Sequence, residues 1–428
     1  MPSTLSADES RFLFQMKDVD FRVVQFSARE AISAPFEVDL ALASEDEIEF
    51  DAVIGKEGLL TILGEEEDRC FHGLLKEFIQ TGSRGSFYLY QARLVPAIWL
   101  LALEQDCRIF QDETVEDIVK KILEETAITS DRYEFRLQGK YQPRGYCVQY
   151  RETDLNFVSR LLEEEGIFYF FEHTPEKHLL VFGDSTVNYQ TIAGERNDED
   201  KTEVAFHLAD GLAPDTDSVR HFVFASQIQP GRVTIRDFNY EKPDVDLTAQ
   251  EEGDTHQMLE VYDYPGVFKE EGIGKTLAQI RLQEATMSKE KAEGQGNCSR
   301  FIPGFTFNLI DHEREDFNQE YYLLEVYHTG EQPQVLEALA SQESGTSYNN
   351  DFVGIPASVT YRPERRTRKP IVEGVQTAIV VGKSGEDIYT DEYGRIKVQF
   401  HWDRKGEMNE KSSCWIRVAQ GWAGTHKR

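Results

Sequence analysis

The stretch from Cys147 to Phe171, which reads CVQYRETDLNFVSRLLEEEGIFYFF, determines much of the local fold. A helix is predicted to begin at Thr153, because apolar residues recur after it at helical spacing. The predicted buried stripe of this helix consists of Leu155, Val158, Leu161 and Leu162. Gly166 is placed to end the helix, and the apolar run Ile167–Phe171 predicts a strand directly after it.

Upstream of this stretch the sequence predicts one more helix and, before it, a sheet. Thr114 is a good N-cap with Asp117 three residues later, so a helix is predicted to follow. Alternation of apolar and polar residues in the first hundred positions is typical of half-buried strands. The predicted strands are Phe12–Met16, Phe36–Leu42, Leu59–Leu63, Phe71–Ile79 and Phe87–Val95. An antiparallel sheet with short connections follows, and curling into a barrel is one way to close it.

Downstream, the pattern is mixed and then changes to a small β domain. The expected elements are a loop at Glu195–Asp200, a strand at Arg232–Tyr240, a helix at Lys275–Lys289, a strand at Tyr321–His328 and a flexible connection at Ser341–Asn350. The basic, proline-bounded run Tyr361–Pro370 is interpreted as a linker. After it, strands are predicted at Val375–Val381, Ile396–Trp402 and Cys414–Ala419, with a turn at Asp391–Gly394. Only about three strands are visible where an OB-fold needs five, so the chain is expected to stop inside this domain.

The predicted fold class is therefore mainly β with some α. It comprises a pair of barrel-like domains with inserted helices, followed by an incomplete OB-fold-like domain. The predicted boundaries are residues 1–105 for the first barrel-like domain, 106–360 for the second, 361–372 for a linker and 373–428 for the partial OB-fold-like domain. In this prediction, segments of the second domain can contribute strands to the sheet of the first domain.

Composition excludes several classes of function. Acidic residues number 77 against 46 basic ones, a formal charge of −31, and such a surface repels both nucleic acid and anionic lipid. The five cysteines are odd in number and widely spaced, so neither a disulfide framework nor a metal knuckle is expected. The first residues contain neither a basic start nor an apolar stretch, so no signal peptide is expected. No stable membrane insertion is expected either, because the longest apolar run, Leu94–Leu103, is far shorter than the roughly 20 residues needed.

Motifs that carry chemistry are largely missing. Gly274-Lys275-Thr276 resembles the end of a phosphate-binding loop, but Lys269 stands where that motif requires a glycine. The chain contains no Gly-x-Ser-x-Gly and no His-Glu-x-x-His. The acidic run Glu163–Glu165 is interpreted as a solvated helix face. No catalytic, cofactor-binding or metal-binding residue is predicted, and the protein is not expected to be an enzyme or to need a cofactor.

A minor alternative is nucleic-acid binding by the OB-like domain, since many such barrels bind oligonucleotides. The candidates for it are Lys397, His401, Arg404 and Lys405. The overall negative charge argues against this alternative.

Five groups of residues carry a resemblance to a known family. They are Cys147–Asp154 with Phe157 and Glu163–Phe170, Arg108–Gln111 with Thr114–Val115, Val261–Gly266, Asp391–Val398 with His401–Asp403, and Ser413–Gln420. They resemble VgrG, the spike protein of bacterial type VI secretion systems, in the order that the family shows and over nearly the whole chain. The resemblance implies two hub barrels like those of contractile phage tails and an OB-fold neck like that of the phage needle. In the family a triple-stranded β-helix follows the neck, and this sequence ends before it.

The resemblance also implies partners and a location. Three copies would form a ring that docks on a hexameric, Hcp-like tube protein among baseplate components. A PAAR-type tip protein and effectors would attach through the missing C-terminal part. The protein would be assembled in the bacterial cytoplasm and secreted through the type VI apparatus. Two alternatives stay open: a hub of a phage or tailocin tail, and, with less support, a peptidoglycan hydrolase.

Overall fold

The computed structural model describes residues 10–17, 19–64, 67–126, 128–192, 202–207, 216–336, 345–386 and 389–419. The chain divides into two compact units. The first contains residues 1–99, 128–139 and 165–364, and the second contains 100–127, 140–164 and 365–428. The predicted loop Glu195–Asp200 lies outside the described residues.

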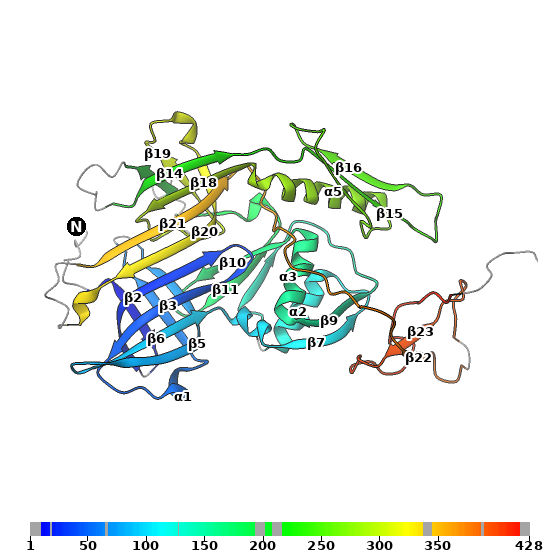
Figure 1. Cartoon of the computed structure of the whole chain (residues 1–428), viewed down its shortest axis with the longest axis horizontal. Helices are drawn as coiled ribbons and strands as arrows, with labels where there is room; N and C mark the ends of the chain where they lie inside the picture. Colours follow the sequence, from blue (N-terminus) through cyan, green and yellow to red (C-terminus); the bar gives the residue numbers. More distant parts are fainter. Residues whose placement is uncertain are drawn as a thin grey trace, which may run out of the picture. The chain divides into compact units, whose positions relative to one another are not determined.

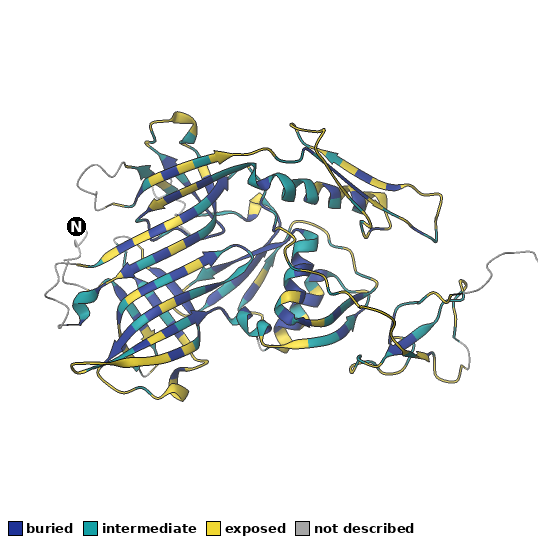
Figure 2. Ribbon diagram, viewed as in Figure 1, coloured by how far each residue is buried: buried dark blue, intermediate teal, exposed yellow. Residues whose placement is uncertain are grey.

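Six strands of the first unit close into a ring. They are β1 (Phe12–Met16), β2 (Val19–Ala31), β3 (Ala34–Ser44), β4 (Glu57–Ile62), β5 (Arg69–Arg84) and β6 (Phe87–Val95). Their order is β1-β4-β5-β6-β3-β2, and β1 also pairs with β2, which closes the ring. A four-residue helix, α1 (Phe50–Val53), precedes β4. Buried and exposed residues alternate along these strands (Figure 2), as a one-sided barrel core requires.

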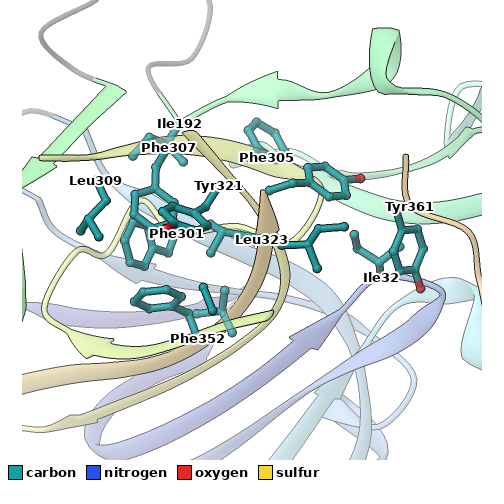
Figure 3. Close-up of a cluster of buried hydrophobic side chains, with 14 of the residues drawn as sticks. Ile32, Ile192, Phe301, Phe305, Phe307, Leu309, Tyr321, Leu323, Phe352 and Tyr361 are labelled. Carbon is teal, nitrogen blue, oxygen red and sulfur yellow. The ribbon is translucent and has the colours of Figure 1, made fainter. Parts of the chain in front are cut away.

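A second ring of six strands follows the same principle. Its members are β13 (Glu203–Phe206), β14 (Ser218–Ser226), β18 (Glu290–Gly296), β19 (Phe305–Ile310), β20 (Glu320–Glu331) and β21 (Ser347–Pro356). The order β20-β21-β18-β14-β13-β19 is closed by pairing of β19 with β20, and β12 (Gln190–Thr191) extends it beside β19. Its core is strongly aromatic (Figure 3): the ring centroids of Phe301 lie 4.6 Å from Phe307 and 5.0 Å from Phe352.

The two rings are joined by strand pairing rather than by side chains alone. Residues Gln25–Ala31 of β2 pair antiparallel with Glu325–Glu331 of β20. The other end of each strand closes its own ring, because Val19–Arg22 pair with β1 and Glu320–Tyr322 pair with β19. One continuous sheet of 13 strands therefore runs through both rings (Figure 1).

Two smaller sheets complete the first unit. One contains β8 (Tyr133–Arg136), β10 (Phe168–His173) and β11 (His178–Gly183). The other contains β15 (Arg232–Asp237), β16 (Leu247–Glu252) and β17 (Glu260–Asp263). Helix α5 (Glu271–Thr286) packs on β15 and β16 through a small core that includes Val233, Ile235 and Phe268.

The described residues of the second unit form two α-helices and two two-stranded sheets. The elements are β7 (Gln105–Phe110), α2 (Val115–Glu125), β9 (Cys147–Thr153), α3 (Asp154–Glu165), β22 (Ala378–Val381) and β23 (Lys397–Phe400). Strand β7 pairs with β9, and β22 pairs with β23. Thr114 caps α2 in a capping box with Asp117, as predicted. Gly166 follows α3 at φ +71°, a conformation that favours glycine. Short 3-10 helices occupy 97–102, 186–188, 287–289, 315–317 and 333–335.

The predicted fold class is confirmed, with local corrections. Cys414–Ala419 was predicted as a strand, but the structure has only an isolated bridge between Ile396 and Ile416 there. Ser341–Asn350 was predicted as a flexible connection, yet β21 begins at Ser347, because its residues pair with β20; residues 341–344 lie outside the described part. The helix predicted from Lys275 begins at Glu271. The proposed domain boundaries stay a prediction.

Candidate functional site: polar networks that hold the hub

The residues of the sequence signature form a buried polar network in the second unit. Arg108 of β7 donates from Nε to Gln149 Oε1 at 2.6 Å and from Nη2 to Asp154 Oδ2 at 2.6 Å. Gln149 Nε2 in turn donates to Asp154 Oδ1 at 2.6 Å. All three side chains are almost completely buried. Since Asp154 begins α3 and Gln149 lies on β9, the network fixes this helix against its two-stranded sheet.

A second ion pair extends the network along α3. Arg160 Nη2 lies 2.8 Å from Glu152 Oε1 and also donates to the Val148 carbonyl oxygen at 2.8 Å. Both charged side chains are less than 10% exposed. Buried charges stay ionised only when paired and hydrogen-bonded. Removing one partner therefore leaves the other charge buried and unpaired. These buried charges of the signature pair with each other and hold β7, β9 and α3 together.

The C-terminal segment, residues 365–419, is attached to the rest of the second unit by polar contacts. Arg404 Nη2 donates to Asp106 Oδ2 at 2.9 Å, and Lys405 Nζ lies 3.4 Å from Glu125 Oε2. Gln376 Nε2 donates to the Tyr150 hydroxyl at 2.9 Å, and its Oε1 accepts from Trp402 Nε1 at 3.0 Å. We call these contacts the seat of the C-terminal segment.

Electrostatics support the main contact of the seat. Burial raises the pKa of Asp106, but hydrogen bonds from Arg404 and from the Cys107 amide outweigh it and hold that pKa below its ordinary value. Asp106 is therefore ionised at neutral pH, as a salt bridge with Arg404 requires.

Two of the four residues suggested for nucleic-acid binding, Arg404 and Lys405, belong to the seat. Arg404 and Lys405 face carboxylates of the same unit. Lys397 donates to the Ser413 carbonyl oxygen at 2.7 Å and lies 5.0 Å from the centroid of the Trp415 ring. His401 is exposed. Arg404, Lys405 and Lys397 thus each have a partner within the protein.

The other candidate motifs also have structural roles. Gly274 lies in the first turn of α5, where an added Cβ would come within 2.4 Å of the Phe268 ring. Close helix packing, not phosphate binding, explains this glycine. Glu163 accepts hydrogen bonds from the amide and hydroxyl of Thr367 at 2.9 and 2.8 Å. The predicted solvated face of α3 therefore contacts the C-terminal segment.

A buried cluster in the first unit was not singled out from the sequence. Arg69 Nη2 donates to both carboxylate oxygens of Glu30 on β2, at 2.7 and 2.6 Å. His328 Nε2 lies 3.2 Å from Glu30 Oε2. His173 Nε2 lies 3.5 Å from the same carboxylate, and His328 Nδ1 lies 2.7 Å from the Tyr348 hydroxyl. Burial raises the pKa of Glu30, but Arg69 and the two histidines lower it well below its ordinary value.

Two further histidines continue this cluster. The Ala97 amide donates to His178 Nε2 at 3.0 Å, so the proton of neutral His178 is on Nδ1 and points to His72 Nδ1, 3.2 Å away. Burial lowers the pKa of His178 to about 2 and that of His173 to about 4, and it lowers those of His72 and His328. All four imidazoles are neutral at pH 7. The sequence shows a glutamate at position 30, but it gives no signal that this position of β2 is buried.

The described residues contain no group of three or more His, Cys, Asp or Glu side chains arranged to hold a metal ion. No helix of this described part has the length and apolar composition that crossing a bilayer requires. All five cysteines are free thiols.

Two joined six-stranded rings with buried polar networks define the class as a mainly β, double-ring protein. Comparison with known proteins gives the family. The family model for the phage tail baseplate hub (GPD) matches residues 29–334. The Pseudomonas aeruginosa type VI secretion system spike protein VgrG4b is 38% identical over 417 residues, which cover 95% of this chain and 50% of that protein. The chain thus spans about half the length of the curated relatives it matches.

Solved structures show the same fold. An Escherichia coli component of the type VI secretion system, described as similar to bacteriophage T4 tail proteins gp27 and gp5, has a TM-score of 0.68 and 22% identity. The match covers 95% of this chain and 92% of that chain. A tail protein from Neisseria meningitidis has a TM-score of 0.55 and 12% identity, covering 82% and 97%.

The chain belongs to the phage tail baseplate hub (GPD) family. The resemblance to VgrG that the sequence predicted is confirmed by the curated relatives, which are named as spike proteins.

Proposed function

We propose that this chain is the hub and the beginning of the neck of a trimeric, cell-puncturing spike in a bacterial type VI secretion system. The observation that carries the proposal is 38% identity to a type VI spike protein over 95% of the chain. The structure supports a mechanical role, because its conspicuous buried charges pair with each other.

The joined rings suit a part that transmits force. The contact between β2 and β20 is a ladder of backbone pairs along seven residues of each strand, so one continuous sheet of the described residues runs through both rings. The cores contain mostly large aromatic and aliphatic side chains. Close-packed interiors have low compressibility and transmit strain, so the work of penetration would come from the contracting sheath and not from chemistry in this chain.

The proposed partners follow from the same assignment. Three copies would form a ring that docks on a hexameric, Hcp-like tube protein within the baseplate. A PAAR-type tip protein and effectors would be carried by residues beyond the neck. The protein would assemble in the cytoplasm and leave the cell through the type VI apparatus. No enzymatic activity of this chain is proposed.

A phage or tailocin tail hub is the second candidate, and the shared fold of the Neisseria meningitidis tail protein favours it. Sequence identity is far higher to the type VI spike protein, 38% against 12%, which supports the secretion system. A peptidoglycan hydrolase has no supporting observation in the described residues.

The decisive experiment replaces the spike gene of the source bacterium with an in-frame deletion. We expect loss of the tube protein from the culture medium and loss of killing of competitor cells, with both restored by the wild-type gene. Unchanged secretion would contradict the assignment to a type VI system. Lysis of purified peptidoglycan by the isolated chain, in proportion to its concentration, would overturn the assignment to a structural part.

A further inference from the structure

The small sheet of β15, β16 and β17 ends in a strand whose apolar side chains are uncovered. In the described part of the chain, β17 pairs only with β15 and leaves its other edge open. Six large apolar side chains between positions 258 and 267 are 39–87% exposed. They are Met258, Leu259, Val261, Tyr262, Tyr264 and Val267. We call residues 258–267 the β17 edge. Open edges with apolar side chains invite pairing with another strand.

The charges around the β17 edge restrict what can cover it. Residues 250–271 contain seven acidic side chains and a single lysine, Lys269. Antiparallel pairing of two β17 edges would place Glu260 of one copy opposite Asp263 of the other, and like charges directly opposite are destabilising. A two-fold contact between identical edges is therefore disfavoured, and a basic, extended segment is the complementary occupant.

The chain itself contains such a segment. Residues 365–375 read RRTRKPIVEGV, with four basic residues and one acidic residue. They lie between β21 and β22 and belong to no helix or strand. Ile371 is 82% exposed and Val375 is fully exposed, while Arg368 and Lys369 are exposed beside them. The segment thus offers basic groups, which are scarce around the β17 edge, together with apolar side chains that can pack on those of the edge.

We propose that the β17 edge of one copy binds segment 365–375 of a second copy as an added strand. Two different surfaces meet in this contact, so it is head-to-tail, and repeated contacts of this kind form a ring when the rotation between copies closes after three of them. The inference rests on the proposed trimeric function and names the surface by which neighbouring copies recognise each other. Main-chain hydrogen bonds would give affinity, and the charges would select the partner, as in other strand additions.

Charge reversal with rescue tests the contact. The variants are Glu260→Lys, Arg368→Glu and the double variant, measured in the 428-residue chain by sedimentation over a range of protein concentrations. Each single reversal places like charges across the contact, so we expect the dissociation midpoint of the trimer to rise about tenfold or more. The double variant restores opposite charges and should recover most of the wild-type midpoint. Asp244→Lys, an exposed acidic residue on the loop before β16, changes the net charge equally and should have no effect.

A second measurement uses disulfide cross-linking of the double variant Tyr262→Cys, Ile371→Cys, with each single cysteine variant as control. Links between two chains support the contact, and links confined to single chains overturn it. The outcomes also separate the two proposals. A monomeric wild-type chain at all concentrations would count against the trimeric function, whereas a trimer that both single reversals leave intact would overturn this inference alone.

Discussion

The Glu30 cluster and the seat of the C-terminal segment use similar residues in opposite environments. The Glu30–Arg69 pair is about 5% exposed on both sides. In the seat, the Arg404 side chain is 72% exposed although its partner Asp106 is only 14% exposed. Solvent screens the seat but not the cluster. The ion pair of the Glu30 cluster therefore contributes to the stability of the first unit, whereas the ion pair of the seat mainly orients the C-terminal segment.

The largest effect is expected from breaking the Glu30 cluster. Replacing Arg69 by Met should lower the free energy of unfolding of the first unit by roughly 3–5 kcal/mol, because it leaves the Glu30 carboxylate buried with only imidazole partners. Thermal or urea unfolding followed by circular dichroism measures this. The double variant Glu30→Leu, Arg69→Met should recover part of the loss, since it removes both charges. A loss below about 1 kcal/mol for the single variant would show that the pair behaves like a surface one.

The signature network should come next. Asp154→Ala leaves Arg108 with only Gln149 and Glu125 as partners, and we expect a loss of about 2–4 kcal/mol. The loss should appear in the second unit, so hydrogen exchange at α3 amides should speed up while exchange in the β-rings is unchanged. The matched control is Asp131→Ala, an exposed carboxylate. Equal exchange at α3 in both variants would contradict the structural role of the signature.

As the pH falls, the Glu30 cluster should lose stability at a higher pH than the seat of the C-terminal segment. Burial lowers the pKa of His173 to about 4, below the value of about 6.5 in unfolded chains. Between these two pH values the unfolded state binds a proton at His173 and the folded state does not. The free energy of unfolding therefore decreases as the pH falls from 6.5 toward 4. The low pKa of Glu30 adds a loss only below about 4.5. At pH 5 the expected cost is on the order of 2 kcal/mol per histidine with so low a pKa.

The measurement is the melting temperature between pH 7.5 and 5, compared with that of His178→Gln. The variant should flatten the profile, since the pKa of His178 is lowered the most among the histidines with a stated value, to about 2. A wild-type melting temperature that is unchanged down to pH 5 would show that these imidazoles are not the acid-sensitive groups.

The smallest effect is expected at the seat. Arg404→Ala should leave the melting temperature nearly unchanged, because the arginine is mostly in water. The segment should nevertheless become easier to cut, and limited proteolysis at Lys405 or Lys411 reports this. Arg314→Ala, which removes an exposed pair with Asp316 elsewhere, should leave the cleavage rate unchanged.

Much of the fold could be predicted from local signals, and what could not has physical causes. Thr114 and Gly166 predicted helix limits because capping is a local property. Strand β2 escaped detection because a register shift between Val23 and Gln25 breaks its alternation: buried positions are odd before it and even after it. Pairing of β2 with β20 joins residues some 300 positions apart, and no local pattern encodes such a distance.

Among the functional residues, too, local motifs could be predicted from the sequence and contacts between distant segments could not. The motif from Cys147 to Asp154 predicted the family, but the contact of Arg108 with Asp154 depends on how β7, β9 and α3 meet. The seat pairs residues such as Asp106 and Arg404, nearly 300 positions apart. With 77 acidic residues in the chain, charge alone could not select these partners.

The ladder between β2 and β20 also has a consequence for how the protein is made. Residues Gln25–Ala31 leave the ribosome long before Glu325–Glu331, their pairing partners. At a synthesis rate of roughly 10 residues per second, this part of β2 waits about half a minute for its neighbour. During that time one edge of β2 is open, while its other edge can already pair with β3. We expect the excess of negative charge, −31 over the whole chain, to keep nascent copies apart until the second ring covers this edge.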